Sequence, residues 1–169
     1  MKRYTVAVLV KNEYGVLNRV TSMFRRRRFN ILALTVSETE TPELSRITVL
    51  FDGDDGNEEQ LVNQLYKLPD VKSIKELHSD DSVSAELLLI KVKNGDGVGE
   101  GILRAAANAF DAKIVDYTKE TVIMQMTGER DRIDAFIDLM RGFEILEICR
   151  TGIVSLERGE VTIRKVTNI

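Results

Sequence analysis

Residues that build disulfides, metal sites and catalytic triads are scarce in this chain of 169 residues. It contains one cysteine, Cys149, and one histidine, His78. A single cysteine forms no internal disulfide, and no His/Cys cluster has the spacing of a zinc site. A cysteine nucleophile also needs a neighbouring base. We therefore expect no catalytic or metal centre, with His78 solvated beside a polar linker and Cys149 as a buried, inert thiol on a strand.

Long apolar runs and a strong excess of one charge are also missing. The longest apolar runs have the length of a strand, which excludes a membrane-spanning helix. The net charge of −3 gives no overall positive field for nucleic acid or anionic lipid. Residues 1–4 lead directly into a strand and show no signal peptide. Together with the single cysteine, these features predict a cytoplasmic protein.

The chain does contain an alternation of strand and helix patterns, and the same order occurs twice. That order is strand, helix, strand, strand, helix, strand. In the first half we expect these elements at residues 4–10, 16–28, 31–38, 45–51, 58–67 and 71–77. In the second half we expect them at residues 83–93, 99–110, 112–117, 122–127, 129–141 and 145–150, and residues 151–159 could add a strand.

Two helices carry more detailed predictions. Asn30 follows the first helix and is a candidate C-cap, because asparagine tolerates the left-handed conformation. In the third helix the apolar spacing places Ile102, Leu103, Ala106 and Phe110 toward the core.

The repeated order predicts an α+β fold of two tandem ferredoxin-like βαββαβ sandwiches, each a sheet with helices on one face. We expect an N-terminal domain at residues 1–78, a linker at 79–82 and a C-terminal domain at 83–169. Each half has about 75 residues, which is small for a stable core. We therefore expect pairing with a second copy through exposed sheet edges or helix faces.

The most informative segment is the turn at residues 11–17, between the first strand and the first helix. Gly15 permits a tight turn there. The free N–H groups at the start of a helix can hold the carboxylate of a small ligand without a charged side chain. Because many such turns bind nothing, these residues alone leave open both a ligand site and a plain turn.

Two other segments allow a functional and a structural interpretation. The glycine-rich loop at residues 94–101 does not match the G-x-G-x-x-G pattern of dinucleotide-binding loops, because Glu100 stands where the third glycine is required. It also lacks the Gly-Lys-Ser/Thr of a phosphate-binding loop. We interpret it as a flexible turn. The four arginines at residues 25–28 end the first helix. They either complement the negative end of the helix dipole or form a docking patch for an acidic partner.

Separated segments along nearly the whole chain carry a family resemblance. They are residues 12–20 (NEYGVLNRV), 29–36 (FNILALTV), 44–48 (LSRIT) and 150–159 (RTGIVSLERG). The N-terminal half resembles an ACT domain, a βαββαβ module that senses small molecules. The whole chain resembles the regulatory, or small, subunit of acetolactate synthase, which is also called acetohydroxyacid synthase.

The resemblance implies a regulatory role in the biosynthesis of valine and isoleucine. Small subunits of this family bind and activate a catalytic subunit that uses thiamine diphosphate, Mg²⁺ and FAD. They also confer feedback inhibition by valine or another branched-chain amino acid. They have no active site and no cofactor of their own. A generic ACT-type amino-acid sensor, acting on another enzyme or on transcription, is the alternative, and a stand-alone enzyme would lack catalytic residues here.

The resemblance also implies an effector site between the ACT domains of a homodimer. One chain would supply Asn12, Glu13, Tyr14, Gly15, Val16 and Leu17, and the other would supply Asn30, Ile31 and Leu32. Backbone N–H groups near Gly15 would bind the carboxylate of valine, and the Asn12 side chain would bind both its carboxylate and its ammonium group. Val16 and Leu17 would form an apolar wall. Tyr14 and Asn18 stand where many relatives have a small residue.

Overall fold

A computed structural model describes residues 2–53, 57–94 and 98–165 of the protein. It confirms two successive βαββαβ patterns, and element bounds differ from the predicted ones by a few residues. The elements are β1 (Lys2–Lys11), α1 (Val16–Arg26), β2 (Asn30–Glu38), β3 (Leu44–Gly53), α2 (Asn57–Leu65), β4 (Val71–Glu76), β5 (Ser82–Lys93), α3 (Val98–Ala109), β6 (Lys113–Tyr117), β7 (Thr121–Gly128), α4 (Arg130–Met140), β8 (Ile145–Arg150), β9 (Val154–Glu157) and the 3-10 helix η1 (Ile163–Lys165). None of the described helices has the length and apolar character needed to cross a membrane.

The chain divides into two compact units, and the division is not sequential. Unit 1 contains residues 1–84 and 152–169, and unit 2 contains residues 85–151. The sequence-based division into 1–78, 79–82 and 83–169 instead groups the tail with the second half. The tail joins unit 1 because Ile163 packs with Ala7, Leu9 and Leu77 in a small apolar cluster.

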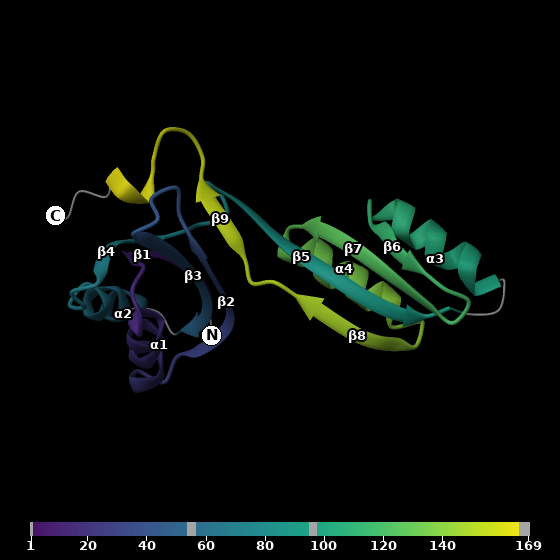
Figure 1. Ribbon diagram of the computed structural model, residues 1–169, viewed down its shortest axis with the longest axis horizontal. Coiled ribbons are helices and arrows are strands. Elements are labelled where there is room, and N and C mark those ends of the chain that lie inside the picture. Colours follow the sequence, from purple (N-terminus) through teal and green to yellow (C-terminus); the bar gives the residue numbers. More distant parts are fainter. Residues whose placement is uncertain (1, 54–56, 95–97, 166–169) are drawn as a thin grey trace. The chain divides into compact units, whose positions relative to one another are not determined.

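Unit 1 is a four-stranded antiparallel sheet in the order β2-β3-β1-β4, with α1 and α2 on one face (Figure 1). Side chains alternate across a strand, so every second residue of β1 faces the helices. Val6 and Val8 face Val20 and Phe24 of α1 in the main core. Ala7 and Leu9 face the other side, where Ile163 of η1 covers them. The tail therefore partly covers a face that the sequence pattern leaves open.

The end of α1 corrects one prediction. Arg28, rather than Asn30, takes the left-handed conformation, with φ 60°, and Asn30 is the first residue of β2. The N–H of Phe29 donates to the carbonyl of Phe24 at 3.0 Å, and that of Arg28 donates to the carbonyl of Arg25 at 3.1 Å. These two bonds form a Schellman motif. Phe24 and Phe29 both contact the ring of Phe51, which explains why the helix ends where it does.

Unit 2 is built in the same way around the strand order β6-β7-β5-β8, with α3 and α4 on one face. Leu88 and Ile90 of β5 lie in its core, and Leu89 between them faces away from the helices. Cys149 on the edge strand β8 is paired with Leu89 and is exposed, so the prediction of a buried thiol was wrong.

The inward face of α3 also differs from the prediction. Ile102 is 53% exposed, whereas Leu103, Ala106 and Ala107 are buried. The apolar spacing alone did not distinguish Ile102 from Leu103, because adjacent residues lie about 100° apart on a helix and both fit the edge of one stripe. In α4, Ile133, Phe136 and Met140 are buried on one face.

Candidate functional site

Residues 12–17, called here the β1–α1 turn, lie on the surface of unit 1. Gly15 has φ 79° and precedes the first residue of α1, so the turn uses a conformation that favours glycine. The N–H of Asn12 donates to the carbonyl of Glu43 at 2.8 Å. The side-chain amide of Asn12 donates to Oε1 of Glu38 at 3.1 Å and to the carbonyl of Pro42 at 2.9 Å. The turn is therefore fixed against the β2–β3 connection.

The first turn of α1 has backbone donors that the described chain leaves unused. The first helical bond runs from the N–H of Arg19 to the carbonyl of Gly15, at 3.0 Å. No hydrogen bond of the described residues uses the N–H of Leu17 or Asn18. No side chain caps the helix, and its first turn holds no acidic residue. These N–H groups and the positive end of the helix dipole make a favourable position for an anion.

Asp70 holds the start of α1 in place through contacts with Arg19 and Lys11. Nε of Arg19 lies 2.7 Å from Oδ2 of Asp70, and the Asp70 carbonyl accepts from the N–H of Lys11 at 2.9 Å. Asp70 is buried, with 7% of its surface exposed. One buried residue therefore holds both the strand that enters the β1–α1 turn and the helix that leaves it, which gives the turn a fixed geometry.

The side chains of the β1–α1 turn divide between core and solvent. Val16 is 3% exposed and belongs to the main core, so only its backbone is available to a ligand. Leu17 is 40% exposed, and Tyr14 is fully exposed at 103%. Glu13 is exposed and lies 3.7 Å from Nζ of Lys11. Tyr14 and Leu17 thus present apolar surface beside the unused N–H groups.

The other three candidate residues lie at the far end of the sheet. Asn30 pairs with Asp52 at one end of β3, whereas Glu38, beside the β1–α1 turn, pairs with Ser45 at the other end. The eight steps from Asn30 to Glu38, at a rise of ~3.2 Å each, separate these ends by about 25 Å. Asn30 is exposed, and Ile31 and Leu32 are partly buried at the start of this edge strand. A single chain therefore does not bring the two groups together.

The single histidine and the glycine-rich loop lie outside the β1–α1 turn. His78 is exposed, and its Nδ1 lies 3.9 Å from Oε1 of Glu76. Among the described residues, no group of three or more His, Cys, Asp or Glu is placed to hold a metal ion. The glycine-rich loop falls partly outside the described residues, at 95–97. Asn94 at its start donates from its side chain to the carbonyl of Thr118 at 2.7 Å.

Sequence reasoning missed a cavity on the face of unit 1 that lies away from the helices. It has a volume of about 650 Å³, and all of its lining residues belong to unit 1. Arg46, Thr48 and Thr35 line it from the sheet, and the tail lines it from Val154 to Arg164. In the sequence, residues 45–48 belong to a predicted strand and to the family-like segment at 44–48. The period of two along β3 would have placed Arg46 and Thr48 on one face, but not under the tail.

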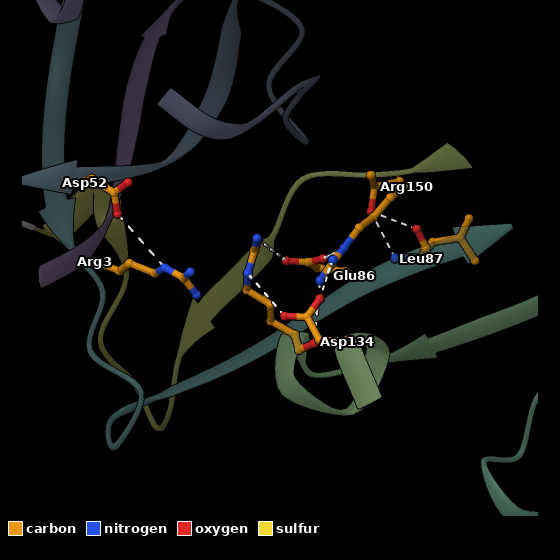
Figure 2. Close-up of polar contacts among 8 residues, drawn as sticks. Arg3, Asp52, Glu86, Leu87, Asp134 and Arg150 are labelled. Carbon is orange, nitrogen blue, oxygen red and sulfur yellow. Dashed lines mark hydrogen bonds and ion pairs between the residues drawn. The ribbon is translucent and has the colours of Figure 1, made fainter. Parts of the chain in front are cut away.

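A buried charge network in unit 2 was also not foreseen. Glu86 has no exposed side-chain surface and pairs with Nε of Arg150, and Nη1 of Arg130 lies 3.1 Å from Oε1 of Glu86. Nη1 of Arg150 lies 2.6 Å from Oδ1 of Asp134 (Figure 2). Burial lowers the pKa of Arg150, but its hydrogen bonds to Asp134 and Glu86 outweigh burial and raise it. The network fixes the last residue of β8, where the tail begins.

Comparisons with known proteins agree on one family. Residues 6–73 match the family model "AHAS small subunit-like ACT domain", and residues 85–159 match "Small subunit of acetolactate synthase". The probable acetolactate synthase small subunit of Archaeoglobus fulgidus is 45% identical, over 93% of this chain and 98% of the relative. The acetolactate synthase small subunit of Mycolicibacterium smegmatis is 41% identical, over 92% of this chain and 91% of the relative. The crystal structure of the small subunit from Thermotoga maritima superposes with a TM-score of 0.87 at 37% identity, and covers 95% of this chain and 100% of that one.

Proposed function

Because the chain belongs to the family of acetolactate synthase small subunits, we propose that it binds and activates a catalytic acetolactate synthase subunit and confers inhibition by valine. The catalytic partner would carry thiamine diphosphate, Mg²⁺ and FAD, and this chain would carry no cofactor and no active site. The assembly would act in the cytoplasm, in the biosynthesis of branched-chain amino acids. The proposal of valine binding rests on the β1–α1 turn. There Gly15 has a left-handed conformation, and the N–H groups of Leu17 and Asn18 that follow it are unused.

The contacts around the turn support specific roles for its residues. The carboxylate of valine would accept from the N–H groups of Leu17 and Asn18 at the positive end of α1. Both N–H groups of the Asn12 amide already donate within the chain, so Oδ1 is the atom left to accept from the valine ammonium group. Asn12 would therefore bind the ammonium group and not the carboxylate. The exposed side chain of Leu17 would contact the isopropyl group.

The distance between the two candidate groups supports a site shared by two chains. Asn30, Ile31 and Leu32 lie about 25 Å from the turn along the same sheet, at the edge strand β2. In a symmetric dimer the interface is formed by the same surface of both chains. Residues 30–32 of each copy can then face the β1–α1 turn of the other copy, which gives two equivalent sites. Valine would bridge the copies and favour one dimer geometry. A coupling of ~1–3 kcal/mol between valine and the catalytic subunit would then be typical.

Reconstitution with a catalytic acetolactate synthase subunit tests the proposal. We expect the wild-type chain to raise acetolactate formation and valine to lower it. Gly15→Asp places a carboxylate against the carboxylate of valine, so inhibition should disappear while activation remains. Gly15→Asn is the matched control, because asparagine has the same shape without the charge, and both residues tolerate a positive φ better than most. We expect Gly15→Asn to retain more of the valine response than Gly15→Asp.

The alternative functions give different results in the same assay. A generic amino-acid sensor would bind valine but leave the catalytic subunit unaffected. Equal valine inhibition of enzyme reconstituted with wild type and with Gly15→Asp would refute the assignment of the effector site. Absence of any activation by the wild-type chain would refute the role as an activating subunit.

A further inference from the structure

The cavity of unit 1 is built on two rows of residues that cross the sheet. One row is Ser37, Arg46, Leu9 and Ser73, in which neighbours are paired across β2, β3, β1 and β4. The next row is Thr35, Thr48, Ala7 and Lys75, paired in the same way. Two residues along a strand point to the same face, so both rows lie on the face opposite α1 and α2. Six of these eight residues carry a hydroxyl or a positive charge, and the other two, Leu9 and Ala7, are apolar. The sheet side of the cavity is therefore polar beside an apolar patch.

Arg46 is the group in this cavity whose charge lacks a close partner. Its Nη2 donates to the carbonyl of Ser155 at 2.7 Å, which holds one of its donors. Among the described residues, no carboxylate forms an ion pair with its guanidinium. Burial lowers the pKa of Arg46, and the charge of Glu157 partly offsets this. Since an arginine stays protonated in proteins, the cavity contains a partly desolvated cation.

The acidic residues around the cavity are already engaged. Glu157 lies 3.1 Å from Nζ of Lys75, and Glu40 lies 2.9 Å from Nη2 of Arg164. Glu38 also lines the cavity, and its Oε1 accepts from the side-chain amide of Asn12 at 3.1 Å. The two ion pairs neutralise the charges at the rim. Among the described residues that line the cavity, Arg46 is the cation that remains without an ion pair.

The rest of the lining combines hydroxyls with apolar side chains. Oγ1 of Thr35 is buried and has no hydrogen-bond partner among the described residues, and Thr48 is 4% exposed. Leu9, Leu77 and Ile163 form an apolar patch beside them. A volume of about 650 Å³ is within the range of small-molecule sites.

We propose that this cavity binds a small carboxylate with a short apolar chain, whose carboxylate pairs with Arg46 and whose chain contacts Leu9, Leu77 and Ile163. A planar guanidinium matches the two oxygens of a carboxylate. The hydroxyl of Thr48, which also lines the cavity, supplies a further donor. The site goes beyond the proposed function, because it lies on the sheet face and shares none of residues 12–17 or 30–32.

The test is a titration of the full chain with isovalerate, followed by calorimetry and by amide chemical shifts. Isovaleramide, which has the same apolar chain without the charge, is the control ligand. We expect saturable binding of isovalerate alone, with shifts at Thr35, Thr48 and Ser155. Arg46→Met keeps the apolar stem and should weaken binding at least about tenfold, because it removes a charged hydrogen-bond partner. Arg46→Lys keeps the charge but loses the planar two-point geometry, so it should bind more weakly than the wild type and more tightly than Arg46→Met.

Three other variants separate this site from its alternatives. Arg25→Met removes an exposed arginine of α1 and should leave isovalerate binding unchanged, as should Gly15→Asp. Thr48→Val keeps Arg46 and the bond to the tail and should weaken binding about threefold, as the loss of one neutral hydrogen bond does. Equal binding of isovalerate and isovaleramide, unchanged binding in Arg46→Met, loss of binding in Gly15→Asp, or no saturable binding would each overturn the proposal. Gly15→Asp tests the effector site separately, so the two proposals can fail independently.

Discussion

Gly152 lies against Thr35 so closely that a Cβ on Gly152 would stand 2.4 Å from Oγ1 of Thr35. The same atom would lie 2.9 Å from the backbone carbon of Leu34, so the contact involves the backbone of β2 and not only a movable side chain. Gly152 is the first residue of the tail that belongs to unit 1. The close approach explains why glycine occurs in the family-like segment at residues 150–159.

Gly152→Ala should destabilise unit 1. The methyl group has to displace Thr35 or the backbone of β2, and such overpacking typically costs ~1–3 kcal/mol. The measurement is the free energy of unfolding in urea. Gly101→Ala in α3 is the control, because nothing lies within 4 Å of its Cβ position. Alanine there should stabilise the helix by ~0.5–1 kcal/mol. Equal effects of the two substitutions would show that Gly152 is not tightly packed.

Glu86→Ala should destabilise unit 2. The substitution leaves Arg130 and Arg150 without their buried carboxylate, and breaking a buried pair in this way typically costs ~3–5 kcal/mol. Glu147→Ala is the control, since its pair with Lys91 at 3.9 Å is exposed. We expect the control to change the free energy of unfolding by less than about 0.5 kcal/mol. A Glu86→Ala protein as stable as this control would contradict the buried network.

Cys149 should react with a thiol reagent in the native protein. Its side chain faces away from the helices of unit 2 on the edge strand β8 and is exposed. We expect the single thiol of each chain to be modified by Ellman's reagent without denaturant, at nearly the rate seen in urea. A reaction that begins only after unfolding would restore the original prediction of a buried thiol.

The fold was predictable from sequence because the local signals agreed with one another. Alternating apolar residues such as Val6 and Val8 marked a half-buried strand, and the spacing of Ile133, Phe136 and Met140 marked a helix face. The predictions were wrong where contacts between residues distant in sequence determine the local structure. Phe29 fixes the end of α1 by packing on Phe51, and this contact cannot be read from residues 27–30 alone.

The candidate site was predictable only in part. Gly15 and the helix start were recognisable from a local pattern, and the structure gives Gly15 the left-handed conformation. The engagement of the Asn12 amide by Glu38 and Pro42 depends on residues more than twenty positions away. The cavity around Arg46 depends on a tail that returns from residue 152 onwards. Neither arrangement has a local signature.

The most direct test of the account is valine binding by a mixture of two defective variants. Gly15→Asp disables the turn, and Asn30→Ala removes the group expected from the other copy, so each variant alone should bind valine at least about tenfold more weakly. In a co-expressed 1:1 mixture, half of the dimers would be mixed and would hold one intact site. Calorimetry should therefore recover wild-type affinity at about a quarter of the sites. Failure of the mixture to recover any tight site would contradict an effector site shared between two chains.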